Sequence, residues 1–263
     1  MNLSFMTANY VARPVNYHMT EGWMQGDNAT NAFFRPIETF PERFDTYMAD
    51  VRALGFDYVD IWLAILHPQW ATEAHTDAAR ESLDRHGLTP VSLAGAFGDT
   101  PDDFEKSCEL ASALDVQILG GMTGLLTSDY QALADLLAKY DLRFGYENHP
   151  EKSPEEVLAK IGFSDYIGTA VDTGWYGTHG YNAAQAIEAL KDRLVYVHLK
   201  DVRAAGGHET CQFGDGVVPV RECVEVLQRI GYDGPVSVEH EPDLYDPSDE
   251  VRASADMLRA WLA

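Results

Sequence analysis

Short apolar runs alternate with helical patterns along the whole chain. Eight runs have the length and the β-branched or aromatic content of buried strands. They lie at Leu3–Asn9, Tyr58–Trp62, Thr89–Ala96, Val116–Met122, Leu142–Glu147, Ile167–Asp172, Leu194–His198 and Pro235–Glu239. A segment with helical periodicity follows each run, at residues 39–54, 71–86, 101–114, 129–140, 154–161, 182–192, 219–230 and 248–262.

Eight strand–helix repeats in 263 residues predict an α/β fold, a single (β/α)8 TIM barrel with one domain over residues 1–263. An open doubly wound sheet is the alternative. That fold normally has a Gly-rich phosphate turn after its first strand, and Ala8-Asn9-Tyr10-Val11 is not such a turn. The two longest connections follow the first and seventh strands, on the face where barrel enzymes place their chemistry.

Acidic or imidazole side chains end four consecutive predicted strands, the fifth to the eighth. These residues are Glu147, Asp172, His198 and Glu239. Because the carboxyl ends of barrel strands surround one face, the four side chains are expected to converge. Three carboxylates and one imidazole suit Mn, Mg, Co or Fe(II) better than a structural zinc site, which favours thiolates. Any one of them alone would more often be a helix cap, a salt-bridge partner or a rim histidine, but their repetition favours a metal site.

Several segments carry a resemblance to a known family. They are ENHP (147–150), VDTGW (171–175), VHLKD (197–201), GDG (214–216) and GYDGPVSVEHE (231–241). The chain resembles the sugar phosphate isomerase/epimerase family of xylose isomerase-like TIM barrels, which includes ketose 3-epimerases and inosose dehydratases. The resemblance covers essentially the whole chain in order.

The resemblance implies roles for particular residues. It implies a divalent metal ion on Glu147, Asp172, His198 and Glu239, with manganese expected and magnesium, cobalt, iron or zinc as alternatives. It also implies that Glu147 and Glu239 transfer protons on opposite faces of a sugar. Arg203 matches an arginine that often contacts the substrate in this family.

Two positions depart from the family pattern and leave the substrate and the reaction open. Trp175 stands where many members have a substrate-binding histidine, and His179 follows four residues later. We expect both side chains to contact the substrate. The acid that often lines the pocket from the second strand is not clearly matched, because Asp60 lies out of obvious register.

The two-residue period of a strand suggests further pocket residues. His149 and Glu241 follow the two key glutamates by two positions, and Lys200 follows His198 by two. His149 is expected either to contact the substrate or to serve in a turn. Lys200 is expected either to pair with an acid at the rim or to contact the substrate.

Aromatic residues gather in the long connection after the first strand, which has little periodicity. Tyr10, His18, Trp23, Phe33 and Phe34 either form a lid that stacks on a sugar or pack the loop onto the barrel. The same two interpretations apply to residues 62, 67 and 70, which are Trp, His and Trp.

The motifs and the resemblance together predict a metal-dependent isomerase or epimerase of a keto-sugar or related polyol. It would abstract a proton alpha to a carbonyl through a metal-stabilised enediolate. A lyase or dehydratase acting on a keto-sugar, keto-glycoside or inosose is the nearest alternative, and a non-catalytic sugar-binding subunit is a more distant one. The glycines at 206–207 and 214–216 fit turns better than a phosphate site, so an unphosphorylated substrate is expected.

Composition narrows the choice of partners. The formal net charge of −23 opposes binding to nucleic acid or anionic membranes, and so opposes the abasic-site endonucleases of the same superfamily. Three scattered cysteines and the lack of a signal-peptide pattern favour a cytoplasmic protein. A small carbohydrate is the expected partner, and a homo-oligomer is compatible with the sequence.

Overall fold

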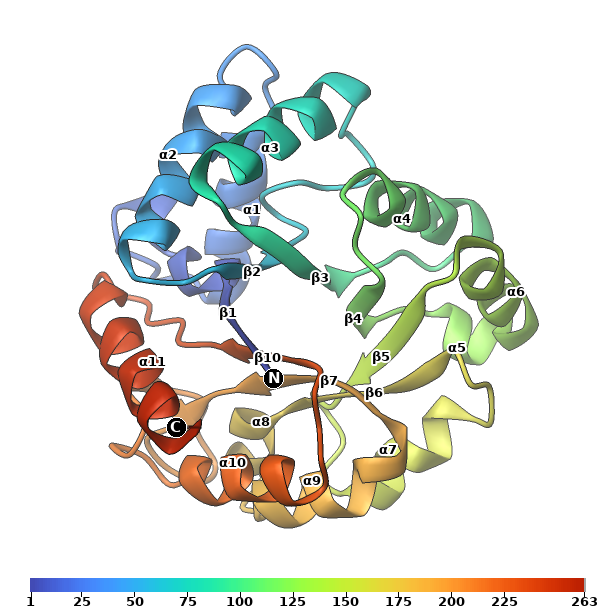
Figure 1. The fold of residues 1–263 in the computed structure, drawn as a ribbon, viewed down its shortest axis with the longest axis vertical. Helices are drawn as coiled ribbons and strands as arrows, with labels where there is room; N and C mark the ends of the chain where they lie inside the picture. The colour runs from blue at the N-terminus through green and yellow to red at the C-terminus, as the bar shows by residue number, and fades with distance from the viewer. Residues whose placement is uncertain (263) are drawn as a thin grey trace.

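The computed structural model, which describes residues 1–262, contains a closed barrel of eight parallel strands (Figure 1). The strands lie around the barrel in chain order, and β10 closes it between β7 and β1. Their bounds are Asn2–Met6 (β1), Tyr58–Trp62 (β2), Thr89–Ala96 (β3), Ile118–Met122 (β4), Arg143–Glu147 (β5), Ile167–Asp172 (β6), Leu194–Leu199 (β7) and Pro235–Val238 (β10). The predicted (β/α)8 barrel is confirmed.

Eight helices surround the barrel. They are α2 (Phe40–Ala53), α3 (Glu73–His86), α4 (Pro101–Ala113), α6 (Tyr130–Tyr140), α7 (Pro154–Ile161), α9 (Ala183–Leu190), α10 (Val220–Arg229) and α11 (Ser248–Leu262). Their termini lie within two residues of the predicted ones, because capping signals mark several of them. Thr100, for example, accepts a hydrogen bond from the backbone N–H of Asp103 and so caps α4.

The connection after β1 differs from the prediction. The first strand ends at Met6, three residues early, and a 3-10 helix occupies Thr7–Tyr10. A second 3-10 helix (Arg13–Val15) and the helix α1 (Trp23–Phe34) follow in a stretch that was expected to be irregular. Helix α1 has a weak sequence signal, because Gly22 precedes it without a side-chain cap and only three of its twelve residues are buried.

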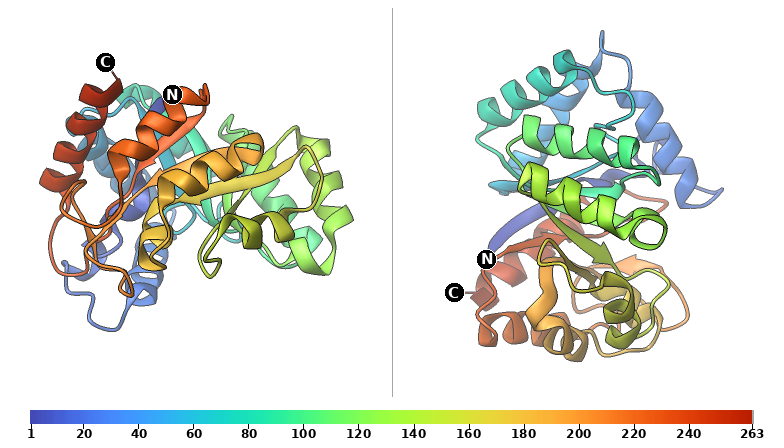
Figure 2. Two further views of the ribbon diagram at one scale, coloured as in Figure 1. Left: turned by 90° about the horizontal axis from the view of Figure 1, so that it is seen from below. Right: turned by 90° about the vertical axis from the view of Figure 1, so that its right-hand side faces the viewer.

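Smaller elements complete the carboxyl-terminal face of the barrel. They are α5 (Leu125–Ser128), α8 (Thr173–Thr178), the 3-10 helix Lys191–Arg193 and a hairpin of β8 (Asp201–Val202) and β9 (Thr210–Cys211). In the side view of Figure 2, both chain termini lie at one end of the barrel, and helix α1 and the loop after β7 extend from the other end. That second end carries the carboxyl ends of the strands.

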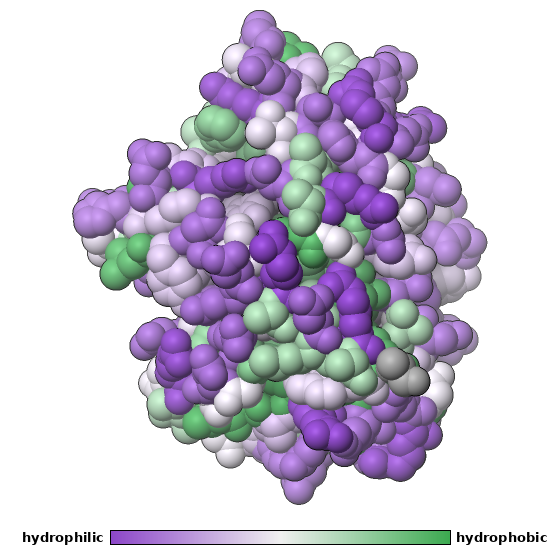
Figure 3. Space-filling view, turned by 60° about the vertical axis from the view of Figure 1, so that its left-hand side comes forward, coloured by the Kyte–Doolittle hydropathy of each residue, from purple (hydrophilic) through white to green (hydrophobic). Residues whose placement is uncertain are grey.

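The face drawn in Figure 3 is mainly hydrophilic, and hydrophobic side chains gather across its lower half. No helix among residues 1–262 is both long and apolar enough to cross a membrane.

Strands β3 and β4 approach each other closely at a glycine pair. Gly121 has a φ of 146°, and a Cβ atom added there would lie 2.0 Å from the carbonyl oxygen of Gly95. An L-amino-acid side chain therefore fits neither the backbone conformation nor the space.

We predict that Gly121→Ala lowers the free energy of unfolding by roughly 1–3 kcal/mol, as an overpacking substitution does. Urea denaturation monitored by circular dichroism measures the change. Gly207→Ala is the matched control, because its Cβ would meet nothing closer than 3.9 Å. Equal stabilities of the two variants would contradict the close approach of the strands.

Candidate metal centre

Four buried side chains meet at the carboxyl ends of four neighbouring strands. Glu147 ends β5, Asp172 ends β6, His198 lies near the end of β7 and Glu239 directly follows β10. Each offers one potential ligand atom, and these atoms lie within 4.8 Å of one another. None of the four residues is more than 6% exposed. The structure therefore brings together all four residues that the sequence pattern singled out.

The imidazole of His198 is oriented from both sides. Its Nδ1 atom lies 2.8 Å from Oε1 of Glu147 and 3.1 Å from Oε2 of Glu239. Its Nε2 atom lies 2.6 Å from the hydroxyl of Tyr196 and 3.0 Å from Oδ2 of Asp60. Nδ1 thus faces the carboxylates that would share a metal, while Nε2 is held by groups deeper in the barrel.

Asp60 lies deeper in the barrel than an acid of the second strand that lines a substrate pocket would. It is fully buried in the barrel interior, where Oδ1 accepts a hydrogen bond of 2.7 Å from Ser92. Its other oxygen faces His198. A carboxylate on the distal nitrogen fixes the ring orientation and raises the basicity of a metal-binding histidine. Asp60 therefore supports the cluster from beneath instead of lining a substrate pocket.

Asp172 uses its two oxygens differently. Oδ1 accepts hydrogen bonds from the backbone N–H groups of Gly174 (2.7 Å) and Trp175 (3.1 Å) and so caps α8. Oδ2 is buried and lies 3.1 Å from the Lys200 ammonium, and Oε2 of Glu239 is buried and lies 3.1 Å from Nδ1 of His198, but neither oxygen accepts a hydrogen bond of good geometry from a described residue. A carboxylate oxygen has more than one acceptor position, so both oxygens remain able to bind a further partner such as a metal ion.

Lys200 is the main positive charge beside the cluster. Its ammonium lies 3.1 Å from a carboxylate oxygen of each of Asp172, Glu239 and Glu241. Burial alone would lower the pKa of Lys200, but these three charges hold it well above its usual value. Lys200 therefore pairs with acids, which is one of the two roles expected for it, and its contact with the substrate stays a prediction.

The pKa values of the two glutamates are lowered in spite of their burial, whereas burial raises the pKa of Asp172. Burial raises the pKa of Glu239, but the charges of Lys200 and His198 outweigh it and bring the pKa to about 2. In the same way, burial opposes the charge of Glu147, but His149 and His198 lower its pKa well below the ordinary value. Ionised carboxylates are the form that binds metal.

The donor set fits a divalent cation. Three carboxylates and one imidazole leave excess negative charge in a buried space, and two of the carboxylate oxygens make only charge contacts, to Lys200 and His198. Hard oxygen ligands with one nitrogen suit Mn, Mg, Co or Fe(II). The cluster is therefore a candidate metal centre.

A stack of aromatic rings lies beside the cluster. The indole of Trp175 stacks on His208 with ring centroids 3.8 Å apart and an interplanar angle of 18°. His149 and His179 lie near the same indole, at centroid distances of 5.2 and 6.1 Å. His149 also places Nε2 3.3 Å from Oε2 of Glu147, which joins the stack to the cluster.

Sequence reasoning missed His208. It follows two glycines in the hairpin after β7, and its Nδ1 lies 2.7 Å from the hydroxyl of Thr178. Burial, helped by the charge of Lys200, lowers the pKa of His208 to about 3, so the ring is neutral at pH 7. The signal available in the sequence was a histidine in the long connection after the seventh barrel strand. The two glycines before it predicted a turn, and the histidine itself was not singled out.

Arg203 lies outside the cluster. It belongs to the hairpin after β7, where its side chain is 43% exposed and lies 3.8 Å from Glu209 and 3.9 Å from Asp215. Its closest charged neighbours are thus acids of the long connection between β7 and α10.

The connection after β1 was expected either to form a lid over the substrate or to pack onto the barrel, and its aromatic residues do not all behave alike. Tyr10 and Phe34 are buried in the core, as packing residues are, and His18 is exposed. Trp23 instead packs at a tilt against Trp62, with ring centroids 5.2 Å apart, and donates a hydrogen bond of 3.3 Å from Nε1 to Glu241. The start of α1 therefore covers one edge of the cluster.

A family model described as "Xylose isomerase-like TIM barrel" matches residues 48–261, which include all four ligand candidates. The chain belongs to the xylose isomerase-like TIM barrel family. This membership agrees with the resemblance found in the sequence.

Two curated proteins are similar in sequence. A D-psicose 3-epimerase of Enterocloster bolteae is 25% identical over 238 residues, which cover 74% of this chain and 76% of that protein. An uncharacterised protein of Methanocaldococcus jannaschii is 28% identical over 152 residues, and the match spans only 50% of its length.

Solved structures share the fold over 82% or more of the chain. A D-tagatose 3-epimerase-like protein superposes with a TM-score of 0.72 at 18% identity, covering 100% of this chain and 97% of the other. A D-allulose 3-epimerase from Methylomonas sp. gives 0.69 at 16% identity, covering 99% and 98%. A 3-keto-D-glucoside 4-epimerase from E. coli gives 0.65 at 17% identity, covering 82% and 94%. At sequence identities of 16–18%, these similarities show a shared fold only.

The position of Asp60 leads to a test of the metal centre. We predict that Asp60→Asn weakens divalent-metal binding by roughly 10–100-fold, because an amide no longer accepts the Nε2 proton with a full charge. Isothermal titration with MnCl2 measures the affinity. Asp57→Asn, the same substitution at an exposed position of this segment, should bind as the wild type does. Equal affinities for both variants would remove Asp60 from the supporting role.

Proposed function

We propose that the protein is a metal-dependent epimerase or isomerase of an unphosphorylated keto-sugar or related polyol. The observation that carries this proposal is the pair of buried carboxylates, Glu147 and Glu239, that approach Nδ1 of His198 at 2.8 and 3.1 Å. Two ionised carboxylates beside one metal position suit the removal and return of a carbon-bound proton. The similarity to a D-psicose 3-epimerase supports the same chemistry.

The metal would be held by Glu147, Asp172, His198 and Glu239, and manganese is the expected ion. When bound, a divalent ion supplies Lewis acidity to the carbonyl oxygen of a ketose and its neighbouring hydroxyl. Lys200 adds a fixed positive charge next to Asp172 and Glu239. The acidity of the proton alpha to the carbonyl rises as positive charge near the carbonyl oxygen increases.

Each glutamate keeps one oxygen for proton transfer. Glu147 directs Oε1 to His198, and its Oε2 lies beside Nε2 of His149. Glu239 directs Oε2 to His198, and its Oε1 lies beside the Lys200 ammonium. We infer that one carboxylate takes the proton from the carbon alpha to the carbonyl, and that the other returns a proton from the opposite face.

The surroundings of the two glutamates differ in their access to water. The side chain of His149 is 31% exposed, so a proton on Glu147 can pass through His149 to the solvent. The side chain of Lys200 is 3% exposed, which shields Glu239 from similar exchange. Epimerisation by this pair should therefore introduce solvent hydrogen into the product.

A neutral substrate suits the charge of the site. The carboxylates of Glu147, Asp172 and Glu239 outnumber the nearby cations, and Lys200 is fully engaged with acids. Sugar hydroxyls can instead bind the imidazoles of His149 and His179 and lie on the indole of Trp175. We propose these three as substrate contacts, with Arg203 reaching the substrate from the rim.

An elimination catalysed by the same residues is the second candidate. His149 lies 3.3 Å from Glu147 and is partly exposed, so it can donate a proton to a departing hydroxyl or alkoxide. A lyase or dehydratase of a keto-sugar, keto-glycoside or inosose would use it in this way.

We predict that the protein with MnCl2 in deuterated water introduces deuterium at the carbon alpha to the carbonyl of a ketose from a panel that includes D-psicose and D-fructose. Glu147→Gln and Glu239→Gln should each reduce this exchange by roughly 10²–10⁴-fold, as loss of a general acid or base does. Proton NMR and mass spectrometry follow the label.

Glu225→Gln, on the exposed face of α10, is the control and should keep full activity. Fully active variants at 147 and 239 would exclude the two glutamates from proton transfer. An ultraviolet-absorbing product that has lost water or an alcohol would favour the elimination instead.

A further inference from the structure

Two of the ligand candidates stand where the backbone ladder between their strands runs out. The register of the parallel ladder between β5 and β6 ends at the pair Glu147 and Ala170, two residues before Asp172. Regular backbone pairing therefore does not fix the distance between Glu147 and Asp172. Another group has to span the two strands at this height for the carboxylates to keep a constant separation.

Asn148 spans this gap. It is fully buried, its Nδ2 donates to the carbonyl oxygen of Asp172 (3.0 Å), and its Oδ1 accepts from the N–H of the same residue (2.9 Å). A side-chain amide carries one acceptor oxygen and N–H donors, as a peptide group does, so it can pair with a backbone in place of a strand. Because Asn148 directly follows Glu147, this pairing ties the ligand candidate that ends β5 to the one that ends β6.

Thr173 makes the next bridge, from β6 to β7. Its hydroxyl accepts from the backbone N–H of Lys200 (2.8 Å) and lies 2.8 Å from the carbonyl oxygen of the same residue, with the carbonyl oxygen of His198 at 3.3 Å. Thr173 is fully buried and directly follows Asp172. The bridge therefore links the second ligand candidate to the end of the strand that carries the third.

Glu239 is held from two sides. Its own N–H donates to the carbonyl oxygen of Leu199 (3.0 Å), which continues the pairing of β7 and β10 as far as the ligand candidate. On the other side, the buried Asn9 donates from Nδ2 to the carbonyl oxygen of Val238 (3.0 Å) and accepts on Oδ1 from the N–H of His240 (2.7 Å). The two partners of Asn9 flank Glu239, so the segment after β1 fixes its position where the barrel closes.

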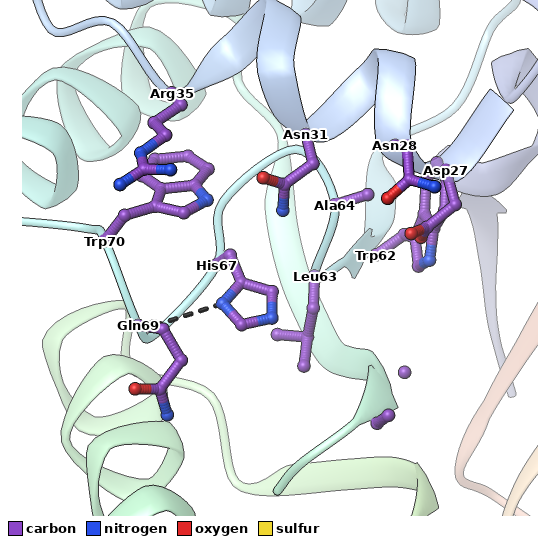
Figure 4. A pocket seen from close by; sticks show the side chains of 12 residues that line it. Asp27, Asn28, Asn31, Arg35, Trp62, Leu63, Ala64, His67, Gln69 and Trp70 are labelled. Carbon is purple, nitrogen blue, oxygen red and sulfur yellow. Dashed lines mark hydrogen bonds between the residues drawn. The ribbon is translucent and has the colours of Figure 1, made fainter. Parts of the chain in front are cut away.

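Satisfying the backbone groups of the barrel mouth is the simpler role for such bridges. Thr7 shows this role, because its hydroxyl accepts from the N–H of Trp62 (2.7 Å) at the end of β2, a strand without a ligand candidate. Trp62 lines a separate cavity of about 430 Å³ beside α1 (Figure 4). The bridges at the ligand strands differ from that of Thr7, since each engages both a backbone N–H and a carbonyl oxygen at or near a ligand candidate. Bonds in both directions restrain the separation of two strand ends more firmly than one bond does.

We propose that Asn148, Thr173 and Asn9 are positioning residues that set the spacing of the four ligand candidates and so decide which divalent ion fits. The inference rests on the proposed function, because it takes these four residues to hold a metal ion. Mg²⁺ demands nearly ideal octahedral geometry at about 2.0–2.1 Å, whereas Ca²⁺ accepts flexible geometry at about 2.3–2.6 Å. Ligands held at a fixed spacing can meet the stricter demand, and the loss of a bridge removes this advantage.

Metal titrations of three variants test the inference. Asn148→Ala, Thr173→Val and Asn9→Ala should each weaken Mn²⁺ binding by roughly 10-fold or more, the effect of losing a group that orients metal ligands. Displacement of bound Mn²⁺, followed by the electron paramagnetic resonance of the free ion, gives the affinities for Mg²⁺ and Ca²⁺. Each variant should lose more affinity for Mg²⁺ than for Ca²⁺. A general loss of stability would instead lower both apparent affinities by the same factor.

Two further variants separate positioning from stability. Thr173→Ser keeps the hydroxyl and should recover the Mn²⁺ affinity and the ratio of Mg²⁺ to Ca²⁺ affinity that Thr173→Val loses. Thr169→Val is the matched control, because this buried hydroxyl of β6 bonds to the carbonyl oxygen of Tyr146 (3.2 Å) where the backbone ladder is intact. It should keep the wild-type ratio. The wild-type ratio in Asn148→Ala, Thr173→Val and Asn9→Ala would overturn the inference.

Failure of the proposed function is distinguishable from failure of this inference. In the first case the protein exchanges deuterium with no ketose, while the ratio of Mg²⁺ to Ca²⁺ affinity still responds to the three substitutions. In the second case a ketose exchanges deuterium normally, and the ratio does not respond. A wild type that binds none of the three ions would overturn both.

Discussion

The structure depends on holding three carboxylates close together inside a barrel mouth. Glu147, Asp172 and Glu239 are buried around one imidazole, where like charges repel and burial penalises each of them. The protein offsets this cost with the Lys200 ammonium, the helix cap that Asp172 makes and the imidazole of His198. Two of the carboxylate oxygens make only charge contacts, and a divalent cation would bind them directly.

The barrel interior positions this arrangement from beneath. Asp60 and Tyr196 hold the distal nitrogen of His198, and Ser92 and Ser237 hold Asp60 and Tyr196 in turn. These groups come from strands on different sides of the barrel, so its closure fixes the imidazole. The same closure brings the starts of α1 and α8 to the edges of the cluster, which links the fold directly to the shape of the substrate space.

Much of this was accessible from the sequence, because barrel strands and their polar ends leave local signals. The runs ending in Glu147 and Asp172 predicted both strands, and both residues stand at the strand ends as expected. Contacts across the barrel leave no such signal: Asp60 and His198 are 138 positions apart. Helix α1 lacks a cap and a wide apolar face, so its fold is set by tertiary packing.

Anomalous diffraction from crystals grown with MnCl2 tests the central claim most directly. The expected result is one strong manganese peak bounded by the carboxylates of Glu147, Asp172 and Glu239 and by Nδ1 of His198. Density for a folded barrel with no peak among these four side chains would contradict the assignment of a metal centre.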